Sequence, residues 1–432
     1  MRVLRGNIPR GNGVSTQTGI AWAIAGEIAQ HLVRSAFVYH GECTWMGTVQ
    51  RGGAMSGASE FTYEALGPDV YGGTAGIALF LAEWHARTGD LASGVAATRA
   101  ARFAAARLGR VPPKFRSGFY SGRIGIAYVL ARSGPLLRTD EFRTAAAREL
   151  DLQRDDTGDD TLLDVISGAA GAVAPTLALA RDLARDDLIT LAERLGDRIV
   201  AGADRGDHGL SWGAGATGFS SPAPLTGFAH GAAGMAWALM ELFTATGHER
   251  FLEAARDALR YEDTVFNATE DNWPDLRYSA ATGAAGHYGM AWCAGAPGIG
   301  LSRIRLGALD TTSAQPARDV AAAIRAVRLH ASETPNVADD DFSLCHGWAG
   351  LGDFLLAASR GQESGAASVL LERIVTQGAD AHAGHPGRWR CGMQRGSTPS
   401  LMLGLAGIGH FFLRVADPTV PSVLLVSPFA GR

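Results

Sequence analysis

Cysteine is scarce in this 432-residue sequence, which contains only four. They are Cys43, Cys293, Cys345 and Cys391. Four cysteines are too few to hold a chain of this size together by disulfides, so a disulfide scaffold is excluded. A reducing compartment, the cytoplasm, is the expected location.

Charge is also limited, since charged residues make up 19% of the chain and the net charge is −4. Lys114 is the only lysine, and we interpret this bias toward arginine as a property of a GC-rich coding sequence. A protein that binds a polyelectrolyte needs a strongly charged surface of its own. Nucleic acid is therefore not an expected partner.

Long apolar runs are missing as well. No stretch reaches the roughly 18 charge-free residues of a membrane span, so no transmembrane helix is expected. The first apolar run, residues 19–29, contains Glu27 and has no clear signal-peptide cleavage site. Export is therefore not indicated.

Glycine, by contrast, recurs in a fixed motif, Gly-x-x-Gly followed by an apolar run. The first glycines of its seven copies are Gly73, Gly122, Gly168, Gly231, Gly295, Gly347 and Gly404. Consecutive copies begin roughly 46 to 64 residues apart, which fits two helices with their connections. The sequence therefore predicts seven helical hairpins.

The two glycines of each copy have different expected roles. The first permits a tight bend where the chain enters a helix. The second lies one helical turn further on, where a missing side chain would let a neighbouring helix approach.

The segments around the motifs predict two layers of helices. Runs such as residues 77–82 and 235–242 are apolar nearly all round, as in helices buried on every side. Segments such as residues 188–198 and 249–261 are charged and amphipathic, as in an outer layer. We predict an all-α fold, an α/α toroid of seven inner and seven outer helices with the glycine turns at one end. An open superhelix of hairpins is the alternative.

The repeat extends from about residue 71 to about residue 413, which favours one cooperative unit over several domains. We therefore divide the chain into an N-terminal segment, residues 1–41, and a toroid domain, residues 42–432.

Two neighbouring copies of the motif carry cysteine at the same position. Cys293 and Cys345 each lie two residues ahead of the first glycine, and His346 follows Cys345. If the copies are structurally equivalent, these three side chains can converge on one metal ion. Two cysteines and one histidine form a known catalytic Zn2+ ligand set that leaves the fourth position open. Taken alone, Cys345 and His346 could equally be structural.

Cys43 and Cys391 lie outside this register and have no histidine beside them. We interpret both as structural.

A second histidine shares the register of His346. His230 also directly precedes the first glycine of its copy, so both should face the same end of the barrel. It is not needed as a ligand and could act as an acid or base, although a satisfied core histidine is the alternative. Asp164, four residues ahead of the first glycine of its copy, could orient His230, transfer protons, or merely cap a turn.

Longer stretches around these residues resemble the lanthionine synthetase C-like (LanC-like) cyclases, and look especially like the cyclase domain of class II lanthipeptide synthetases. They are residues 164–168 (DVISG), 227–234 (GFAHGAAG), 292–298 (WCAGAPG), 345–347 (CHG) and 401–409 (LMLGLAGIG). The resemblance covers roughly residues 45–425. It implies the α/α toroid, zinc at Cys293, Cys345 and His346, and acid or base roles for His230 and Asp164.

Two positions depart from that pattern. Ala294 stands where related cyclases often have histidine or tyrosine, and Gly289 stands where some have an active-site arginine. His287 and Tyr288 lie close by and could substitute, although packing at a helix edge is the interpretation we favour.

The resulting hypothesis is a stand-alone, zinc-dependent lanthipeptide cyclase. It would add peptide cysteine thiolates to dehydroalanine or dehydrobutyrine and form thioether rings. Residues 1–41 are too few for the dehydratase of a bifunctional enzyme. The expected partners are therefore a dehydrated precursor peptide and separate dehydratase or kinase and lyase proteins.

Three alternatives remain at this point. The protein could be a non-catalytic peptide-binding scaffold, with Cys43 or Cys391 as a fourth ligand of a structural zinc. It could also add a different thiol to dehydroamino acids, or contribute to an aminovinyl-cysteine type ring. A toroidal glycosidase is less favoured, because no pair of carboxylates occupies equivalent positions in the repeat.

Overall fold

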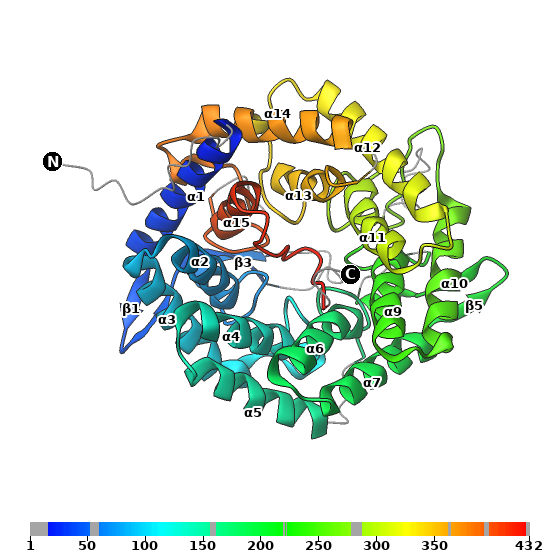
Figure 1. The fold of residues 1–432 in the computed structure, drawn as a ribbon, viewed down its shortest axis with the longest axis horizontal. Coiled ribbons are helices and arrows are strands. Elements are labelled where there is room, and N and C mark those ends of the chain that lie inside the picture. The colour runs from blue at the N-terminus through cyan, green and yellow to red at the C-terminus, as the bar shows by residue number, and fades with distance from the viewer. Residues whose placement is uncertain are drawn as a thin grey trace.

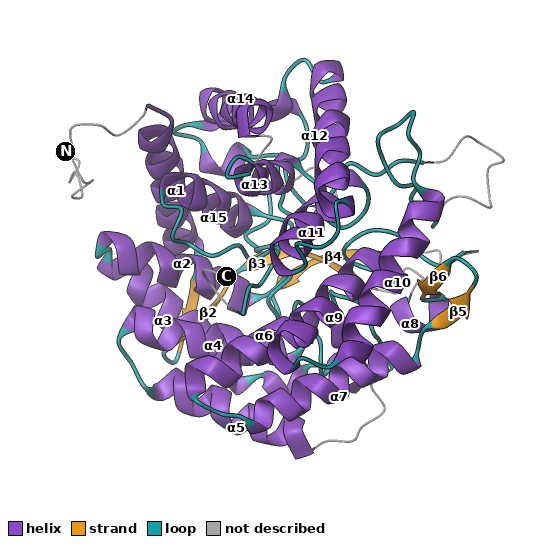
Figure 2. Ribbon diagram, turned by 45° about the vertical axis from the view of Figure 1, so that its right-hand side comes forward, coloured by secondary structure: helices purple, strands orange, loops and turns teal. Residues whose placement is uncertain are grey.

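A computed structural model describes the chain over residues 16–51, 60–155, 161–218, 221, 223–277, 287–361, 364–392 and 397–428. Helices dominate this part, and its strands are short (Figure 2). Two rings of helices, one inside the other, surround a common axis (Figure 1). The structure is the predicted all-α fold, an α/α toroid.

The inner ring has seven helices within the described residues. They are α2 (Thr74–Thr88), α4 (Arg123–Leu137), α6 (Ala169–Leu183), α9 (Ala232–Thr246), α11 (Ala296–Leu309), α13 (Trp348–Ala358) and α15 (Leu405–Ala416). In α2 and α9, the first eleven residues are all buried, as expected of runs that are apolar on every side. Neighbouring inner helices pack in chain order, and α15 packs against α2. The ring is therefore closed, which excludes the open superhelix.

The outer ring has seven helices in the same part of the chain. They are α1 (Thr16–Ser35), α3 (Leu91–Ala106), α5 (Glu141–Asp155), α7 (Asp187–Ala201), α10 (Glu249–Val265), α12 (Gln315–Glu333) and α14 (Ser364–His382). Helix α7 buries Leu188, Leu191, Leu195 and Ile199, which form one stripe at spacings of three and four residues. The outer helices thus cover the inner ring with one face and leave the other to solvent.

The pairing of the two rings differs from the prediction in one unit. Helices α3, α5, α7, α10, α12 and α14 each pack against the inner helix that precedes them. The last inner helix, α15, packs instead against α1. Seven hairpins were expected, and this is wrong for the seventh unit, which joins the two ends of the chain. Helix α1, which precedes the division predicted at residue 42, completes the outer ring.

Short elements lie between the helices. The strands form three antiparallel ribbons, β1 (Phe37–Tyr39) with β2 (Glu42–Thr44), β3 (Met46–Arg51) with β4 (Glu60–Ala65), and β5 (Asp204–Gly206) with β6 (Gly209–Ser211). The short helices are α8 (Ala214–Thr217), η1 (Leu108–Arg110), η2 (Pro113–Phe115), η3 (Val337–Asp339) and η4 (Pro386–Arg388). Within the described ranges, none of the helices combines the length and apolar character needed to span a bilayer.

The glycine motif begins every inner helix. Its first glycine is the N-cap residue in all seven. At the second glycine, the nearest atom to an added Cβ would be the carbonyl oxygen of the residue six positions earlier, and the two would overlap. The expected approach of a neighbouring helix is therefore wrong. The second glycine is required because the turn that enters the helix folds back over its first residues.

Candidate active site and metal centre

A closed ring of backbone hydrogen bonds joins the seven entering turns around the axis of the toroid. It passes through the residue two positions ahead of each first glycine, and we call these residues the axial ring: Tyr71, Tyr120, Ile166, Ala229, Cys293, Cys345 and Met402. In each unit an N–H donates to the axial-ring carbonyl oxygen of the next unit, at 2.9 to 3.2 Å. The donor is the axial-ring residue itself, except in the third unit, where it is Val165.

The axial ring confirms that the copies of the motif are structurally equivalent. Cys293 and Cys345 occupy the same position in adjacent units, and the N–H of Cys293 donates to the carbonyl oxygen of Cys345 at 3.2 Å. His230 and His346 each follow an axial-ring residue, so they too are equivalent. Sequence spacing therefore placed these side chains in the correct register.

The two cysteine side chains contact each other. Neither forms a disulfide, and Cys345 is only 2% exposed. A hydrogen bond from the Cys345 thiol lowers the pKa of Cys293, even though burial opposes this, and the His346 charge acts in the same direction. The same hydrogen bond, together with burial, raises the pKa of Cys345 well above its ordinary value.

His346 lies beside this sulfur pair and is oriented by a carboxylate. Its Nε2 is 3.4 Å from Oδ2 of Asp341. The other carboxylate oxygen of Asp341 accepts the N–H of Ser343 at 2.6 Å, which fixes the carboxylate. Burial opposes protonation of His346, but the hydrogen bond and the charge of Asp341, together with the charge of Cys293, outweigh burial and raise the pKa of the imidazole.

The donor chemistry of this group fits zinc. Within the described ranges no three His, Cys, Asp or Glu side chains are arranged as a formed metal site. However, two thiols in contact beside an imidazole supply the atoms that zinc prefers. A metal-binding histidine commonly directs its second ring nitrogen to a carboxylate, as His346 does toward Asp341. Cys293, Cys345 and His346 are therefore the residues that could hold the ion.

Asp164 and His230 form a hydrogen-bonded pair close to the cysteines. Asp164 Oδ2 is 2.5 Å from Nδ1 of His230, and Oδ1 accepts the N–H of Ser167 at 2.8 Å. Of the three roles considered for Asp164, the contacts of a turn cap and of a partner that orients His230 are both present. Asp164 is 2% exposed, and the His230 charge is near enough to lower the pKa of Cys293.

A buried carboxylate that the sequence did not reveal fixes the turn that carries His230. Glu262, on α10, accepts the N–H groups of Gly227 and Ala233 with Oε1, both at 3.1 Å. Its Oε2 accepts from Arg303 on α11 at 2.5 Å, and both side chains are fully buried. Glu262 therefore links the turn around His230 to the helix that follows Cys293.

Arg277 is a second residue that the sequence did not reveal. Its guanidinium pairs with both carboxylate oxygens of Asp275, at 2.8 and 2.6 Å. Its charge contributes to the lowered pKa of Cys293 and partly opposes the rise in the pKa of His346, so it contributes positive charge to the site. No motif marks Arg277 in the sequence.

The two departures from the family pattern contact each other. A Cβ on Gly289 would lie 2.6 Å from the carbonyl oxygen of Ala294, so a side chain at residue 289 would displace this turn. The hydroxyl of Tyr288 accepts from the Asn267 side chain at 2.6 Å, and the carbonyl of His287 accepts from the N–H of Asp275 at 2.7 Å. Both residues therefore make contacts within the loop around residues 267–275 and 287–289.

The two remaining cysteines are buried. The Cys43 thiol is 3.4 Å from the carbonyl oxygen of Ala96 on the outer helix α3. The Cys391 thiol is 4.0 Å from the carbonyl oxygen of Thr398. Burial raises the pKa of each thiol to about 12. Both contacts suit the structural role expected for these residues.

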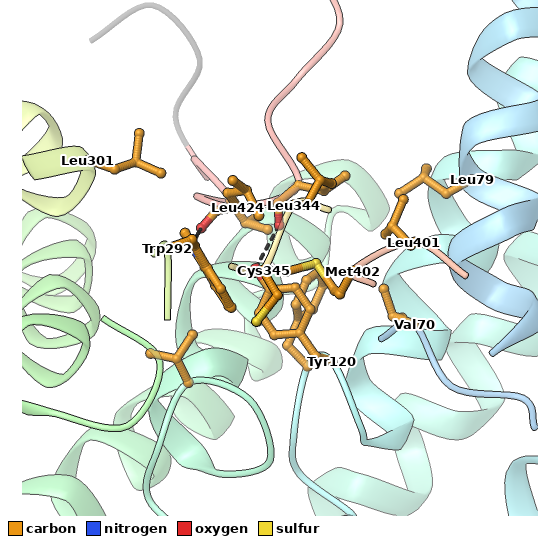
Figure 3. Close-up of a cluster of buried hydrophobic side chains, with 14 of the residues drawn as sticks. Val70, Leu79, Tyr120, Trp292, Leu301, Leu344, Cys345, Leu401, Met402 and Leu424 are labelled. Atoms are coloured by element: carbon orange, nitrogen blue, oxygen red, sulfur yellow. Dashed lines mark hydrogen bonds between the residues drawn. The ribbon is translucent and has the colours of Figure 1, made fainter. Parts of the chain in front are cut away.

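The C-terminal tail crosses the centre of the toroid and packs beside the cysteines (Figures 1 and 3). Tyr120 donates its hydroxyl to the carbonyl oxygen of Val423 at 2.7 Å, and the Trp292 indole donates to that of Leu424 at 3.1 Å. Figure 3 shows Cys345 among Leu344, Met402, Tyr120 and Trp292. The sulfur pair is thus enclosed by apolar groups on this side.

Comparison with known proteins identifies a family. A model of the family described as lanthionine synthetase C-like protein matches residues 64–425. The structure is similar to that of nisin cyclase, with a TM-score of 0.64 and 16% sequence identity over 93% of this chain and 95% of that chain. At this identity the similarity is one of fold.

Two other solved structures have lower TM-scores. One is the unsaturated glucuronyl hydrolase from Bacillus sp. GL1, with a TM-score of 0.44 and 14% identity over 72% of this chain and 82% of that chain. The other is an α-1,6-mannanase from Salegentibacter sp. HEL1_6, with a TM-score of 0.41 and 11% identity over 84% and 99%. Scores this low carry no information about activity. No curated protein sequence matches the chain.

Proposed function

The chain belongs to the lanthionine synthetase C-like family, and on that premise we propose that it is a stand-alone, zinc-dependent lanthipeptide cyclase. A cysteine thiolate of a dehydrated peptide adds to the β-carbon of dehydroalanine or dehydrobutyrine. A carbon–sulfur bond forms, the carbon–carbon double bond becomes single, and the α-carbon gains a proton. The thiol loses one proton and the α-carbon gains one, so the product is an isomer of the substrate.

The observation that carries this proposal is the arrangement of two groups in adjacent units of the repeat. Cys293 and Cys345 contact each other, and the Asp164–His230 pair lies in electrostatic reach of Cys293. A thiol-binding centre and a proton-transfer pair are the two components that the addition requires. Both belong to the turns at the glycine-motif end of the inner helices.

Cys293, Cys345 and His346 are the proposed zinc ligands. When bound, zinc would favour the thiolate form of a peptide cysteine near neutral pH. Asp341 engages Nε2 of His346, which would leave Nδ1 to hold the ion.

His230 is the proposed proton-transfer residue, with Asp164 setting its orientation. Asp164 engages Nδ1, so proton exchange with the peptide falls to Nε2. The positive charge of Arg277, which influences Cys293 and His346, favours the negative charge that develops on the substrate as sulfur adds.

The test uses purified protein, supplied with zinc, and a peptide that carries one dehydroalanine and one cysteine. After incubation the peptide is treated with an alkylating reagent, and its mass is measured by mass spectrometry. We expect the cysteine to become resistant to alkylation while the peptide mass stays unchanged. The variant C345S should bind less zinc and lose the activity, whereas C43S, altered on strand β2 away from the site, should retain both. Alkylation equal to that of an enzyme-free sample would overturn the proposal.

A further inference from the structure

We propose that Tyr71 is a positioning residue for the metal centre, holding the Cys345 sulfur in place through its phenolic hydroxyl. This inference rests on the proposed function, because it takes Cys345 as a zinc ligand. The hydroxyl oxygen of Tyr71 lies 3.0 Å from Cys345 Sγ, although 274 positions separate the two residues in the sequence.

The backbone of Tyr71 is held on both sides. Tyr71 belongs to the axial ring, its N–H donates to Tyr120 at 2.9 Å, and its carbonyl accepts from Met402 at 3.0 Å. Its ring packs edge to face against that of Tyr120, with 6.4 Å between the centroids. Main chain and ring are therefore both fixed, and the hydroxyl has a defined position relative to the sulfur.

The Tyr71 hydroxyl is the donor in this contact, and the Cys345 sulfur is the acceptor. Tyr71 therefore directs an O–H group at the sulfur. A hydroxyl donor can stabilise negative charge on Cys345.

Such a contact matters for a metal ligand in two ways. It fixes the side-chain rotamer of the cysteine before the ion arrives, and it draws part of the sulfur charge away from the ion. Partners that contact metal ligands in this way typically change metal affinity about 10- to 100-fold when they are removed. Tyr71 is therefore expected to influence zinc affinity without touching zinc.

The chain provides a matched control. Tyr120 is the tyrosine at the equivalent position in the next unit, and its hydroxyl donates to the backbone of Val423. Y71F and Y120F each remove one hydroxyl from the axial ring and keep the aromatic ring. Only Y71F removes a donor to sulfur.

The experiment measures zinc affinity by competition with a chelator, and the sulfur-to-metal charge-transfer band after replacement of zinc by cobalt(II). For Y71F we expect zinc binding to weaken about 10-fold or more and the band to shift. Y120F should match the unaltered protein in both readouts, even if its thermal stability falls. If Y71F does not fold, Tyr71→Leu is judged by the same readouts.

The failure of this inference differs from the failure of the proposed function. If the unaltered protein binds zinc and Y71F has the same affinity and spectrum, the inference about Tyr71 is wrong and the cyclase proposal stands. If the unaltered protein binds no zinc at all, both are wrong. Equal effects of Y71F and Y120F would also overturn the inference, because they would indicate a general effect on the axial ring.

Discussion

Asp164 uses its two carboxylate oxygens differently. One accepts the N–H of Ser167 and shapes the turn, and the other engages His230. Asp164→Asn should retain the first contact, since the amide oxygen can still accept. It should lose the second, because the amide nitrogen cannot accept a hydrogen bond from the imidazole N–H. The variant therefore separates the orientation of His230 from the folding of the turn.

We expect Asp164→Asn to lower the initial rate of ring closure by about 100-fold or more, as for the loss of a general acid or base. Zinc content and the thermal unfolding midpoint should stay close to those of the unaltered protein. The rate is measured from the loss of alkylatable peptide thiol. An unchanged rate would remove Asp164 from the mechanism.

His410, on α15, is a buried histidine outside the site. Burial, reinforced by Arg132 and Arg87, lowers its pKa from 6.5 to about 3. Between these values the unfolded chain binds a proton that the folded chain does not. The stability due to the neutral imidazole is thus fully present above pH 6.5 and is lost as the pH falls toward 3.

Replacing His410 by Phe should reduce this loss of stability at acid pH. The slope of the unfolding free energy against pH should fall by up to about 1.4 kcal/mol per pH unit, the value for one proton. It is measured from urea unfolding midpoints across the acid range. The control is His208→Phe at an exposed turn, for which we expect the slope of the unfolding free energy against pH to stay as in the unaltered protein. An unaltered slope in His410→Phe would show that other groups govern acid unfolding.

At the scale of single elements, the second glycine of each motif is the most restrictive position. A Cβ on Gly125 would overlap the carbonyl oxygen of Phe119, which belongs to the turn that enters the same helix. Backbone cannot move aside as a flexible side chain can. Gly125→Ala should therefore destabilise the fold by about 2 kcal/mol or more.

The matched substitution is Gly365→Ala on α14, where an added Cβ meets open space. Here the change should be neutral or stabilising by up to about 1 kcal/mol, because alanine favours the helix. Both effects are read from unfolding midpoints in urea. Equal midpoints for the two variants would contradict the proposed reason for the glycine.

The sequence predicted that the candidate site residues with fixed positions relative to the motif would lie close together. Cys293, Cys345 and His346 are fixed relative to their glycines, and so are His230 and the turn of Asp164. These residues come close to one another once the units of the repeat are placed side by side. The same repeat predicted the inner and outer helices.

Two contacts could not be predicted from position relative to the motif. Tyr71 and Cys345 hold the same position in their copies, but the first and sixth units come close only because the ring closes. Glu262 reaches Gly227 from the middle of an amphipathic helix. Nothing in the local pattern around Glu262 distinguishes it from a solvent-facing carboxylate. The role of the second glycine was also misjudged, because its partner lies in the preceding turn and not in another helix.

At the scale of the whole molecule, the toroid depends on contact between the first and last helices. Ile28 on α1 is fully buried, and a Cβ on Gly409 of α15 would lie 3.0 Å from its Cγ2. Ile28→Ala should cost about 2 to 5 kcal/mol, as for other truncations in a well-packed core. Gln30→Ala, on the exposed face of the same helix, should have little effect.

The comparison is made by urea unfolding followed by tryptophan fluorescence. We expect one transition for Ile28→Ala, shifted to lower urea, because α1 closes the outer ring. A separate early transition, with the main transition unmoved, would mean that α1 is an appendage.

Every bond of the axial ring joins main-chain atoms, so the side chains at its seven places are not set by that bonding. Ala229 and Met402 flank the two cysteines in the ring. A cysteine at either place would present a third thiol to the same axis without removing a bond of the ring. The architecture thereby separates the evolution of its chemistry from the evolution of its shape.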